Sequence, residues 1–333
     1  MNPVVGHEWA ARLLLNGLER GHVSHATLIV GPPNVGKTAL ARWFAQALNC
    51  TGDPPRPCGN CPACRKVEQD IHPDVRVLDA PGERLIIDQV RELQHELALS
   101  PYEGRWRVAI LCDFERATAE AANALLKTLE EPPPAVVLLL TAAEADVLLP
   151  TIVSRCQLVT LCPLPVQRVE EALSTHWGAE PGKARDLAHL SQGCLGWAVR
   201  ALQDKTILER RAENLAELEA MGHKGRVERL AYAAALSRDD QLAREALQLW
   251  VTWWRDVVLL AAGAGAALTL TNVDRVDSLR QQANQVTLQE ARRIVAQLKF
   301  LLRSLDQYVS LRLALEVLLL SLPYAESPKP SVR

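Results

Sequence analysis

Short apolar runs alternate with amphipathic stretches over the first half of the chain. Apolar runs bounded by polar residues predict strands, whereas apolar residues that recur every three or four positions predict helices. Strands are predicted at 26–30, 75–78, 107–112, 135–141 and 157–161, and helices at 37–49, 86–99 and 117–130. Strands that alternate with helices indicate a parallel sheet covered by helices on both faces, which is an α/β domain.

The pattern changes near residue 163, after which the strand signals stop. Short helices are predicted at 166–176, 183–190 and 197–202, and amphipathic helices follow from 205 almost to Leu322. We therefore predict an α/β domain, a small helical domain, a larger all-α domain and a short flexible tail. Their predicted bounds are 1–163, 164–205, 206–325 and 326–333.

Composition and charge exclude several classes of protein. The 333 residues are 48% hydrophobic and 23% charged, which is typical of globular domains. The net charge of −2 provides no global attraction for nucleic acid, so contact with DNA would need a local patch or partner proteins. Arg91, Arg105 and Arg107 are scattered candidates for such a patch. No signal peptide or membrane span is predicted, and we expect a cytoplasmic protein with no membrane contact.

The segment that follows the first strand and runs into the first predicted helix reads GPPNVGKT and fits the pattern G-x-x-x-x-G-K-[ST]. Its glycines let backbone N–H groups surround phosphate oxygens, with a lysine on the β- and γ-phosphates and a hydroxyl on Mg²⁺. The preceding strand and following helix supply the context that this loop requires. The sequence therefore predicts an ATP site with Mg²⁺, formed by Gly31, Pro32, Pro33, Asn34, Val35, Gly36, Lys37 and Thr38.

Four of the eight cysteines lie after the helix predicted at 37–49; they are Cys50, Cys58, Cys61 and Cys64. The spacing C-x7-C-x2-C-x2-C presents four thiolates to one ion, which favours a closed, structural Zn²⁺ site in a module at about 50–64. Four free thiols are the alternative. The remaining cysteines lie in or beside apolar runs, and we expect them to be small core residues. They are Cys112, Cys156, Cys162 and Cys194.

Five blocks carry a family resemblance: residues 5–8 (VGHE), the loop and its helix up to Cys50, the cysteine insert, residues 122–133 (ANALLKTLEEPP) and residues 149–156 (LPTIVSRC). In order and spacing they resemble bacterial clamp-loader subunits of DNA polymerase III, which are AAA+ proteins. The resemblance implies an AAA+ domain, a helical lid and a helical collar that joins subunits. It also implies gamma/tau and delta partner subunits, and a role in placing the sliding clamp on primed DNA during replication.

The same resemblance gives Arg155 its expected role. In the family, the Ser-Arg-Cys motif, here residues 154–156, sends an arginine into the ATP site of a neighbouring subunit. A guanidinium stabilises the charge that develops on the γ-phosphate, so hydrolysis then depends on assembly. Glu130 and Glu131, at the end of the helix predicted at 117–130, are expected to be capping or solvated charges.

The family contains ATP-hydrolysing gamma/tau motors and delta-prime-type subunits, and departures from the motor pattern favour the second. Cys112 stands where the motor has its metal-binding aspartate, and Asp113 where it has its catalytic glutamate. Trp197 takes the place of a sensor arginine. We also expect the protein to have neither the motor's lead-in before residue 5 nor the tau extension after residue 333. Thr141 is a candidate γ-phosphate sensor.

We therefore expect a delta-prime-type subunit that binds ATP, donates Arg155, and has weak or no ATPase and no polymerase activity of its own. The alternative is a gamma/tau-type motor, because a one-residue shift at Cys112 and Asp113 would restore a metal-binding carboxylate. A zinc-dependent nucleic-acid binder is a third possibility, against which the near-neutral charge counts. The tryptophans at 250, 253 and 254 have the spacing of a buried helix face rather than a base-stacking platform.

Overall fold

The computed structural model describes residues 4–79, 84–263, 270–304 and 310–324. The chain forms two compact units, the first from Met1–Ala172 with Gly193–Trp197, and the second from Leu173–Gln192 with Ala198–Arg333. The finer division into three domains stays a prediction, and the predicted tail at 326–333 lies outside the described residues.

The first unit contains a five-stranded sheet of order β2-β3-β4-β1-β5, in which every paired neighbour is parallel. The strands are β1 (Ala26–Val30), β2 (Val75–Leu78), β3 (Arg107–Leu111), β4 (Val136–Ala142) and β5 (Gln157–Thr160). The predicted strands are confirmed to within one residue at each end. Ala135 was expected to begin β4, but its φ of 58° is left-handed and places it in the turn before the strand.

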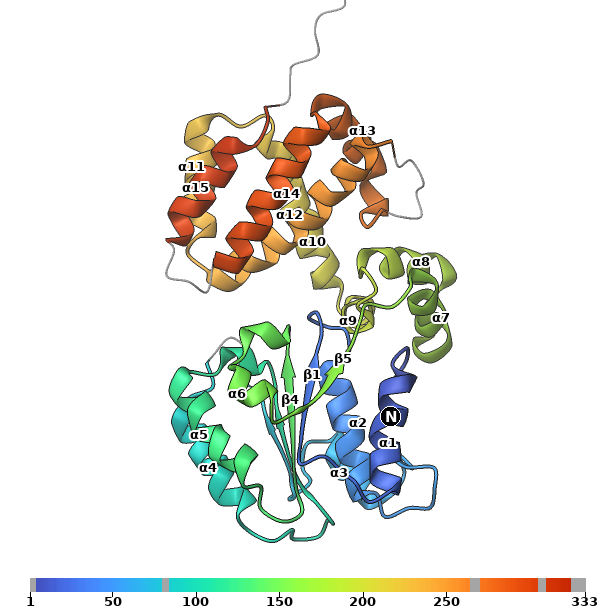
Figure 1. Cartoon of the computed structure of the whole chain (residues 1–333). Coiled ribbons are helices and arrows are strands. Elements are labelled where there is room, and N and C mark those ends of the chain that lie inside the picture. Colours follow the sequence, from blue (N-terminus) through green and yellow to red (C-terminus); the bar gives the residue numbers. More distant parts are fainter. Residues whose placement is uncertain (1–3, 80–83, 264–269, 305–309, 325–333) are drawn as a thin grey trace, which may run out of the picture. The chain divides into compact units, whose positions relative to one another are not determined.

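Helices cover both faces of this sheet, as the alternating pattern predicts (Figure 1). They are α1 (Glu8–Glu19), α2 (Lys37–Asn49), α3 (Pro62–Glu68), α4 (Ile87–Leu97), α5 (Ala119–Glu130) and α6 (Pro150–Val153), with the 3-10 turns η1 (Phe114–Arg116) and η2 (Ala145–Val147). Along β1, Ile29 packs with α1 and α2, whereas Leu28 and Val30 pack with α4 and α5. The sheet is therefore the buried middle layer of three.

The strand order determines where the chemistry gathers. β1 is central and pairs with β4 on one side and β5 on the other, while the chain after α2 goes on to β2 at the far edge. Because all five strands are parallel, the segments that follow β1, β3 and β4 leave from the same edge of the sheet. Ligands in open α/β sheets bind at this carboxyl edge, beside the strand where the order reverses.

The remaining described helices are α7 (Val166–Trp177), α8 (Pro181–Leu190), α9 (Leu195–Gln203), α10 (Lys205–Met221), α11 (Arg226–Leu236), α12 (Asp240–Ala261), α13 (Val276–Gln285), α14 (Leu288–Ser304) and α15 (Leu311–Ser321), with the turn η4 (Val273–Arg275). The core of the second unit includes Trp250, Trp253 and Trp254, each at most 1% exposed. Their interpretation as a buried helix face is confirmed, and burial excludes a base-stacking platform.

The second unit also contains a fully buried arginine that joins the ends of two helices. Arg229 donates hydrogen bonds to the carbonyl oxygens of Met221 at 2.6 Å, Leu319 at 2.9 Å and Leu322 at 2.7 Å. These oxygens lie at the C-terminal ends of α10 and α15, where helices leave carbonyls without intrahelical partners. One guanidinium therefore caps two helices.

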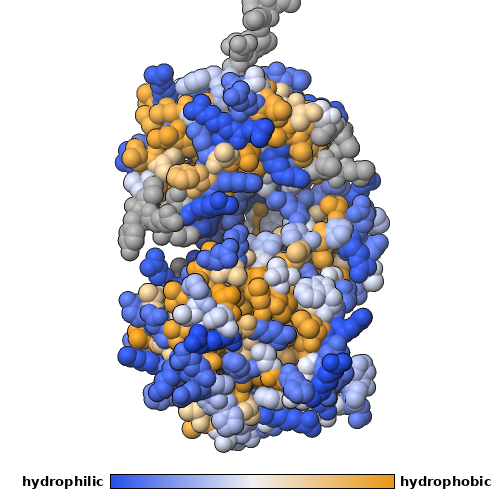
Figure 2. All heavy atoms as spheres, in the orientation of Figure 1, coloured by the Kyte–Doolittle hydropathy of each residue, from blue (hydrophilic) through white to orange (hydrophobic). Residues whose placement is uncertain are grey.

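No described helix has the length and apolar character needed to cross a membrane. On the face that Figure 2 shows, hydrophilic residues are interspersed among hydrophobic ones over the described parts of both units. This face therefore has mixed polarity rather than one continuous apolar patch.

Candidate functional site

The loop after β1 has the backbone that the glycine pattern predicts. Gly31 and Gly36 have φ values of 153° and 116°, and Asn34 between them is left-handed at 63°. A Cβ atom on Gly31 would lie 2.4 Å from the carbonyl oxygen of Leu161, so a larger residue would displace the loop from β5. α2 begins directly afterwards at Lys37, which aims the N-terminal N–H groups of a helix at the loop.

Lys37 is 6% exposed and folds back on this loop. Its ammonium donates hydrogen bonds to the carbonyl oxygens of Gly31 at 2.7 Å and Pro32 at 3.1 Å. Burial lowers the pKa of Lys37, while the nearby charges of Asp113 and Glu115 oppose that shift. None of the ion pairs among the described residues includes Lys37. A desolvated cation held mainly by neutral carbonyls favours an incoming anion, as a phosphate site requires.

Thr38, Cys112, Asp113 and Thr141 come together at the carboxyl edge of the sheet. The Thr38 hydroxyl lies 3.9 Å from the Cys112 sulfur. The Asp113 N–H donates to the Thr141 hydroxyl at 2.9 Å, which joins the ends of β3 and β4. The sequence-predicted residues of the nucleotide site are therefore neighbours. Their individual roles stay predictions.

Burial raises the pKa of the Cys112 thiol to about 11. Near neutral pH this side chain is a protonated, weakly polar thiol. Mg²⁺ prefers hard oxygen ligands in an octahedron, and a protonated thiol is not one. The hydroxyl of Thr38, the predicted Mg²⁺ ligand, thus lies beside a sulfur that offers Mg²⁺ no hard oxygen ligand.

Glu115 belongs to the same group, although the sequence pattern gave it no role. The turn η1 brings its carboxylate back toward the sheet, where Oε1 accepts the N–H of Ala143 at 3.1 Å. Burial, with the charge of Asp113, raises the pKa of Glu115, and the Lys37 ammonium opposes the shift. The only sequence signal was its position two residues after Asp113, because a 3-10 turn is too short to give a periodicity.

A segment from far along the chain contacts the loop. The N–H of Gly196, at the start of α9, donates to the carbonyl oxygen of Asn34 at 2.9 Å. A Cβ on Gly196 would lie 2.7 Å from that oxygen, so the approach requires glycine. Cys194 is close enough to Lys37 for the ammonium to lower its pKa, although burial raises it more. Residues 193–197 therefore pack against the phosphate loop.

The Gly196 contact gives a testable expectation. We expect Gly196→Ala to push this segment away from Asn34 and to weaken ATP binding about tenfold, at a cost to stability of about 1–3 kcal/mol. Gly182→Ala is the matched control: Gly182 is also the second residue of a helix, and a Cβ atom there would have nothing within 4 Å. There, replacement of glycine should be neutral or stabilising. Equal effects of both substitutions on titrated ATP affinity would contradict the assignment.

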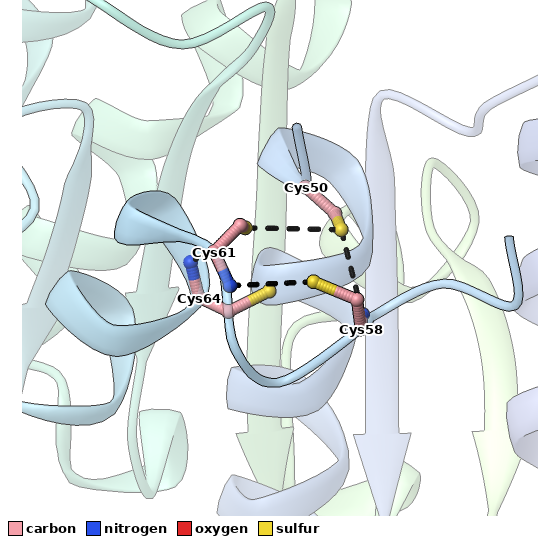
Figure 3. A group of neighbouring side chains, drawn as sticks. All are labelled: Cys50, Cys58, Cys61 and Cys64. Atoms are coloured by element: carbon pink, nitrogen blue, oxygen red, sulfur yellow. Dashed lines mark hydrogen bonds between the residues drawn. The ribbon is translucent and has the colours of Figure 1, made fainter. Parts of the chain in front are cut away.

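The four predicted zinc ligands form one cluster. Cys50 lies at the end of α2, Cys58 in the loop, and Cys61 and Cys64 at the start of α3 (Figure 3). Their sulfur atoms all lie within 4.8 Å of one another, and the Cys50 and Cys61 sulfurs are 3.9 Å apart. Four sulfurs around one centre fit the tetrahedral set that Zn²⁺ takes in structural sites.

Backbone donors around these sulfurs favour thiolates. The N–H groups of Cys58, Cys61 and Cys64 each donate to the sulfur of the preceding ligand, at 3.4 Å. Although burial raises the pKa of Cys61, the N–H of Cys64 and contacts with Thr51 lower it to about 5. Backbone N–H bonds also lower the pKa of Cys58, whereas burial raises that of Cys64. The N–H donors therefore favour the thiolate, the form that binds a metal, at Cys58 and Cys61.

The cysteine module is fastened to the core by side-chain amides and a carboxylate. Gln46 donates to the carbonyl oxygen of Cys64 at 3.0 Å, and Asn49 bonds the backbone of Arg105 and Trp106 at 2.9 Å. Asp74 accepts the N–H groups of residues 102–104 at 2.6–2.8 Å. Burial alone would raise the pKa of Asp74, but these three N–H bonds lower it. The module and the neighbouring loop at 102–106 are therefore both fastened to the core.

The four cysteines outside the cluster differ in burial. Cys112, Cys156 and Cys194 are partly buried, in line with the expectation of small residues in or beside the core. Cys162 is exposed, so the prediction that it packs in the core is wrong. It follows β5 at the edge of the sheet, where an apolar run in the sequence does not imply two covered faces.

Arg155 projects from an anchored base. Ile152, Val153 and Cys156 pack against the core formed with α4 and α5, which fixes the short segment from α6 to β5. The Arg155 guanidinium donates to the carbonyl oxygen of Thr151 at 2.9 Å and pairs with Glu130 at 2.8 Å. The Arg155 side chain remains 35% exposed. Glu130 is exposed, in line with the expectation of a solvated charge, and it is in addition the ion-pair partner of Arg155.

The three candidates for a DNA patch have separate contacts within the chain. Arg107 bonds the carbonyl oxygen of Ser100 at 3.1–3.2 Å and lies 3.8 Å from Asp74, whereas Arg91 lies 3.9 Å from Asp88 on the exposed side of α4. Arg105 contributes its backbone N–H to Asn49. Arg107 therefore has a structural role in holding the 100–105 loop.

The parallel sheet, its strand order and the glycine loop at the carboxyl edge of β1 define a P-loop protein of the AAA+ class. Residues 6–165 match the family model described as "DNA polymerase III, delta subunit". Over these residues, just under half of its length, the chain matches the clamp-loader subunit family of DNA polymerase III, and its relatives include subunits named tau and delta'.

Curated relatives support this family. The chain is 37% identical over 210 residues to the DNA polymerase III subunit tau of Escherichia coli, covering 61% of this chain and 32% of that protein. It is 32% identical over 202 residues to the subunit delta' of Bacillus subtilis, covering 61% of each. The chain thus spans about a third to three fifths of these relatives.

Among solved structures, the chain is similar to a DNA polymerase III gamma subunit-related protein of Thermotoga maritima. The match has a TM-score of 0.44 at 21% identity and covers 94% of this chain and 97% of that one.

Proposed function

We propose that this chain is a delta-prime-type clamp-loader subunit that binds ATP and lends Arg155 to the ATP site of a neighbouring subunit. Within a loader it would act with gamma/tau and delta subunits to place the sliding clamp on primed DNA. The observation that carries this proposal is the pairing of Thr38 with the Cys112 thiol at 3.9 Å, beside an intact phosphate loop. The chain retains what holds phosphates and lacks the carboxylate that organises Mg²⁺.

Arg155 supports the second half of the proposal. Its guanidinium is solvent-accessible, and the segment that carries it is anchored in the core. Arg155 comes after α6 in the sequence and is not part of the phosphate loop of its own chain. A guanidinium supplied from a neighbour stabilises the charge that develops on a transferred phosphoryl group, without any other chemistry in the donating subunit.

Two cofactors follow from the same residues. The phosphate loop would hold the phosphates of ATP through its backbone N–H groups and Lys37, and the bound nucleotide would stabilise the first unit by mass action. The four cysteines would hold Zn²⁺, which has a structural role because all its ligand positions are taken by protein. ATP hydrolysis by this chain itself is weak in this proposal, because the thiol beside Thr38 is protonated and does not help to bind Mg²⁺.

A gamma/tau-type motor is the second candidate, favoured by the carboxylates of Asp113 and Glu115, whose charges act on Lys37. In that reading one of them would activate water, and the pKa of Glu115, raised by burial, would make it a stronger base than an ordinary glutamate. The two candidates differ in whether ATP bound to this chain is consumed.

Lys37→Ala separates them. We expect the substitution to abolish ATP binding to the isolated chain, because it removes the cation on the phosphates. The amount of ATP hydrolysed per loader should remain essentially unchanged, because other subunits do the hydrolysis. The measurement is the pre-steady-state burst of a reconstituted loader with clamp and primed DNA, with Lys205→Ala as an exposed-lysine control. Loss of a full site's share of the burst would establish the motor instead.

A further inference from the structure

Glu130 occupies a defined position behind Arg155. It is the last residue of α5, and its Oε1 lies 2.8 Å from Nη2 of Arg155. On the other terminal nitrogen, Nη1 donates to the carbonyl oxygen of Thr151 at 2.9 Å and approaches the Ser154 hydroxyl at 3.4 Å. Two elements of the fold thus grip the two terminal nitrogens of one guanidinium.

This grip fixes the plane of the guanidinium and leaves part of it accessible. An arginine has five N–H donors in a rigid fork, and two anchored nitrogens determine where the others point. Among the described residues, the Nε of Arg155 has no partner, and one N–H of Nη2 is left beyond the bond to Glu130. Those donors are available to a group outside this chain while both anchors stay in place.

The supports are themselves held. α5 begins with a side-chain cap from Thr118 and packs on α4, with Leu125 and Leu129 in the core. The segment of Thr151 packs through Ile152, which is fully buried. Long arginine side chains otherwise sample many rotamers, which lowers the fraction of time spent in a productive geometry.

We propose that Glu130 is the positioning residue of Arg155: its carboxylate holds the guanidinium in the orientation that reaches the γ-phosphate bound by the neighbouring subunit. Glu130 does not contact the nucleotide and acts only through Arg155. The inference rests on the proposed function of Arg155 and adds to it the residue that makes the arginine effective before the subunits meet.

The test is a double-mutant cycle in the reconstituted loader, with gamma/tau and delta subunits, clamp and primed DNA. We expect Glu130→Gln, which keeps the size but removes the charge, to lower kcat at the site facing Arg155 about tenfold. The KM for ATP should stay unchanged, because ground-state binding belongs to the neighbour's own loop. In an Arg155→Ala background, Glu130→Gln should have no further effect.

Glu131→Gln is the matched control, since it makes the same charge change at the next, exposed residue. If Glu130→Gln leaves kcat unchanged while Arg155→Ala lowers it, the positioning role is overturned and the donated arginine stands. If Glu130→Gln lowers kcat equally with and without Arg155, Glu130 acts independently and the inference is wrong. If Arg155→Ala itself has no effect, the proposed function fails and the positioning role fails with it.

Discussion

Arg155→Ala is expected to silence one ATP site of the loader although it leaves that site's own subunit intact. Arginines donated in trans contribute on the order of a thousandfold or more to phosphoryl-transfer rates. In the reconstituted loader, the burst of ATP hydrolysed on primed DNA should therefore shrink by one site's share. ATP binding to this chain should not change, because Arg155 lies after α6 and outside its phosphate loop.

Two further variants make this result specific. Arg155→Lys keeps the charge but loses the planar fork, and should recover little of the lost rate. Arg168→Ala removes another exposed, ion-paired arginine, the partner of Glu8 at 3.4 Å, and should leave the burst intact. A full burst from Arg155→Ala would remove the main reason to regard the chain as a subunit that assists its neighbour.

Cys64→Ser is expected to produce the largest loss of stability. Cys64 is fully buried in the cysteine cluster, and a three-ligand site binds Zn²⁺ far more weakly than a four-ligand one. Because metal binding and folding of the module are coupled, we expect the free energy of unfolding to fall by about 3–5 kcal/mol. Metal analysis should show about one zinc per chain in the wild type and far less in the variant.

Cys156→Ser is the control for the chemical change itself. Cys156 is a partly buried thiol outside the cluster, and burial raises its pKa to about 11, so it is neutral and has no metal role. Its replacement should cost little stability and no zinc. A strong chelator should destabilise the wild type to the level of Cys64→Ser and leave Cys64→Ser itself unaffected. Equal zinc content in both cysteine variants would exclude the proposed site.

The sequence alone was enough to predict the α/β part of the fold. All five strands were predicted to within one residue at each end, because a buried parallel strand is a continuous apolar run between polar residues. α1, α3 and α6 were not predicted. α3 and α6 are only 7 and 4 residues long, too short for a helical period to emerge.

The candidate sites were predictable where they are contiguous in sequence and were missed where they depend on tertiary contacts. The phosphate loop and the cysteine cluster each occupy one short segment, so their spacing carries the geometry. Glu115, Glu130 and Gly196 had no such signal. Glu130 is 25 residues from Arg155, and Gly196 is 162 residues from Asn34. Only the folded chain shows that these residues meet.

The short segment Gly193–Trp197 belongs to the first unit although the residues on both sides of it belong to the second. The polypeptide therefore passes between the units three times, at residues 172/173, 192/193 and 197/198. A recombinant fragment that ends at residue 163 or 172 would contain every glycine of the phosphate loop and every proposed zinc ligand. It would lack the hydrogen bond from the N–H of Gly196 to the carbonyl oxygen of Asn34. Truncation experiments on this protein therefore need fragments that extend past residue 197. Such fragments also contain residues 173–192 of the second unit, so no single cut isolates the first unit with its phosphate loop complete.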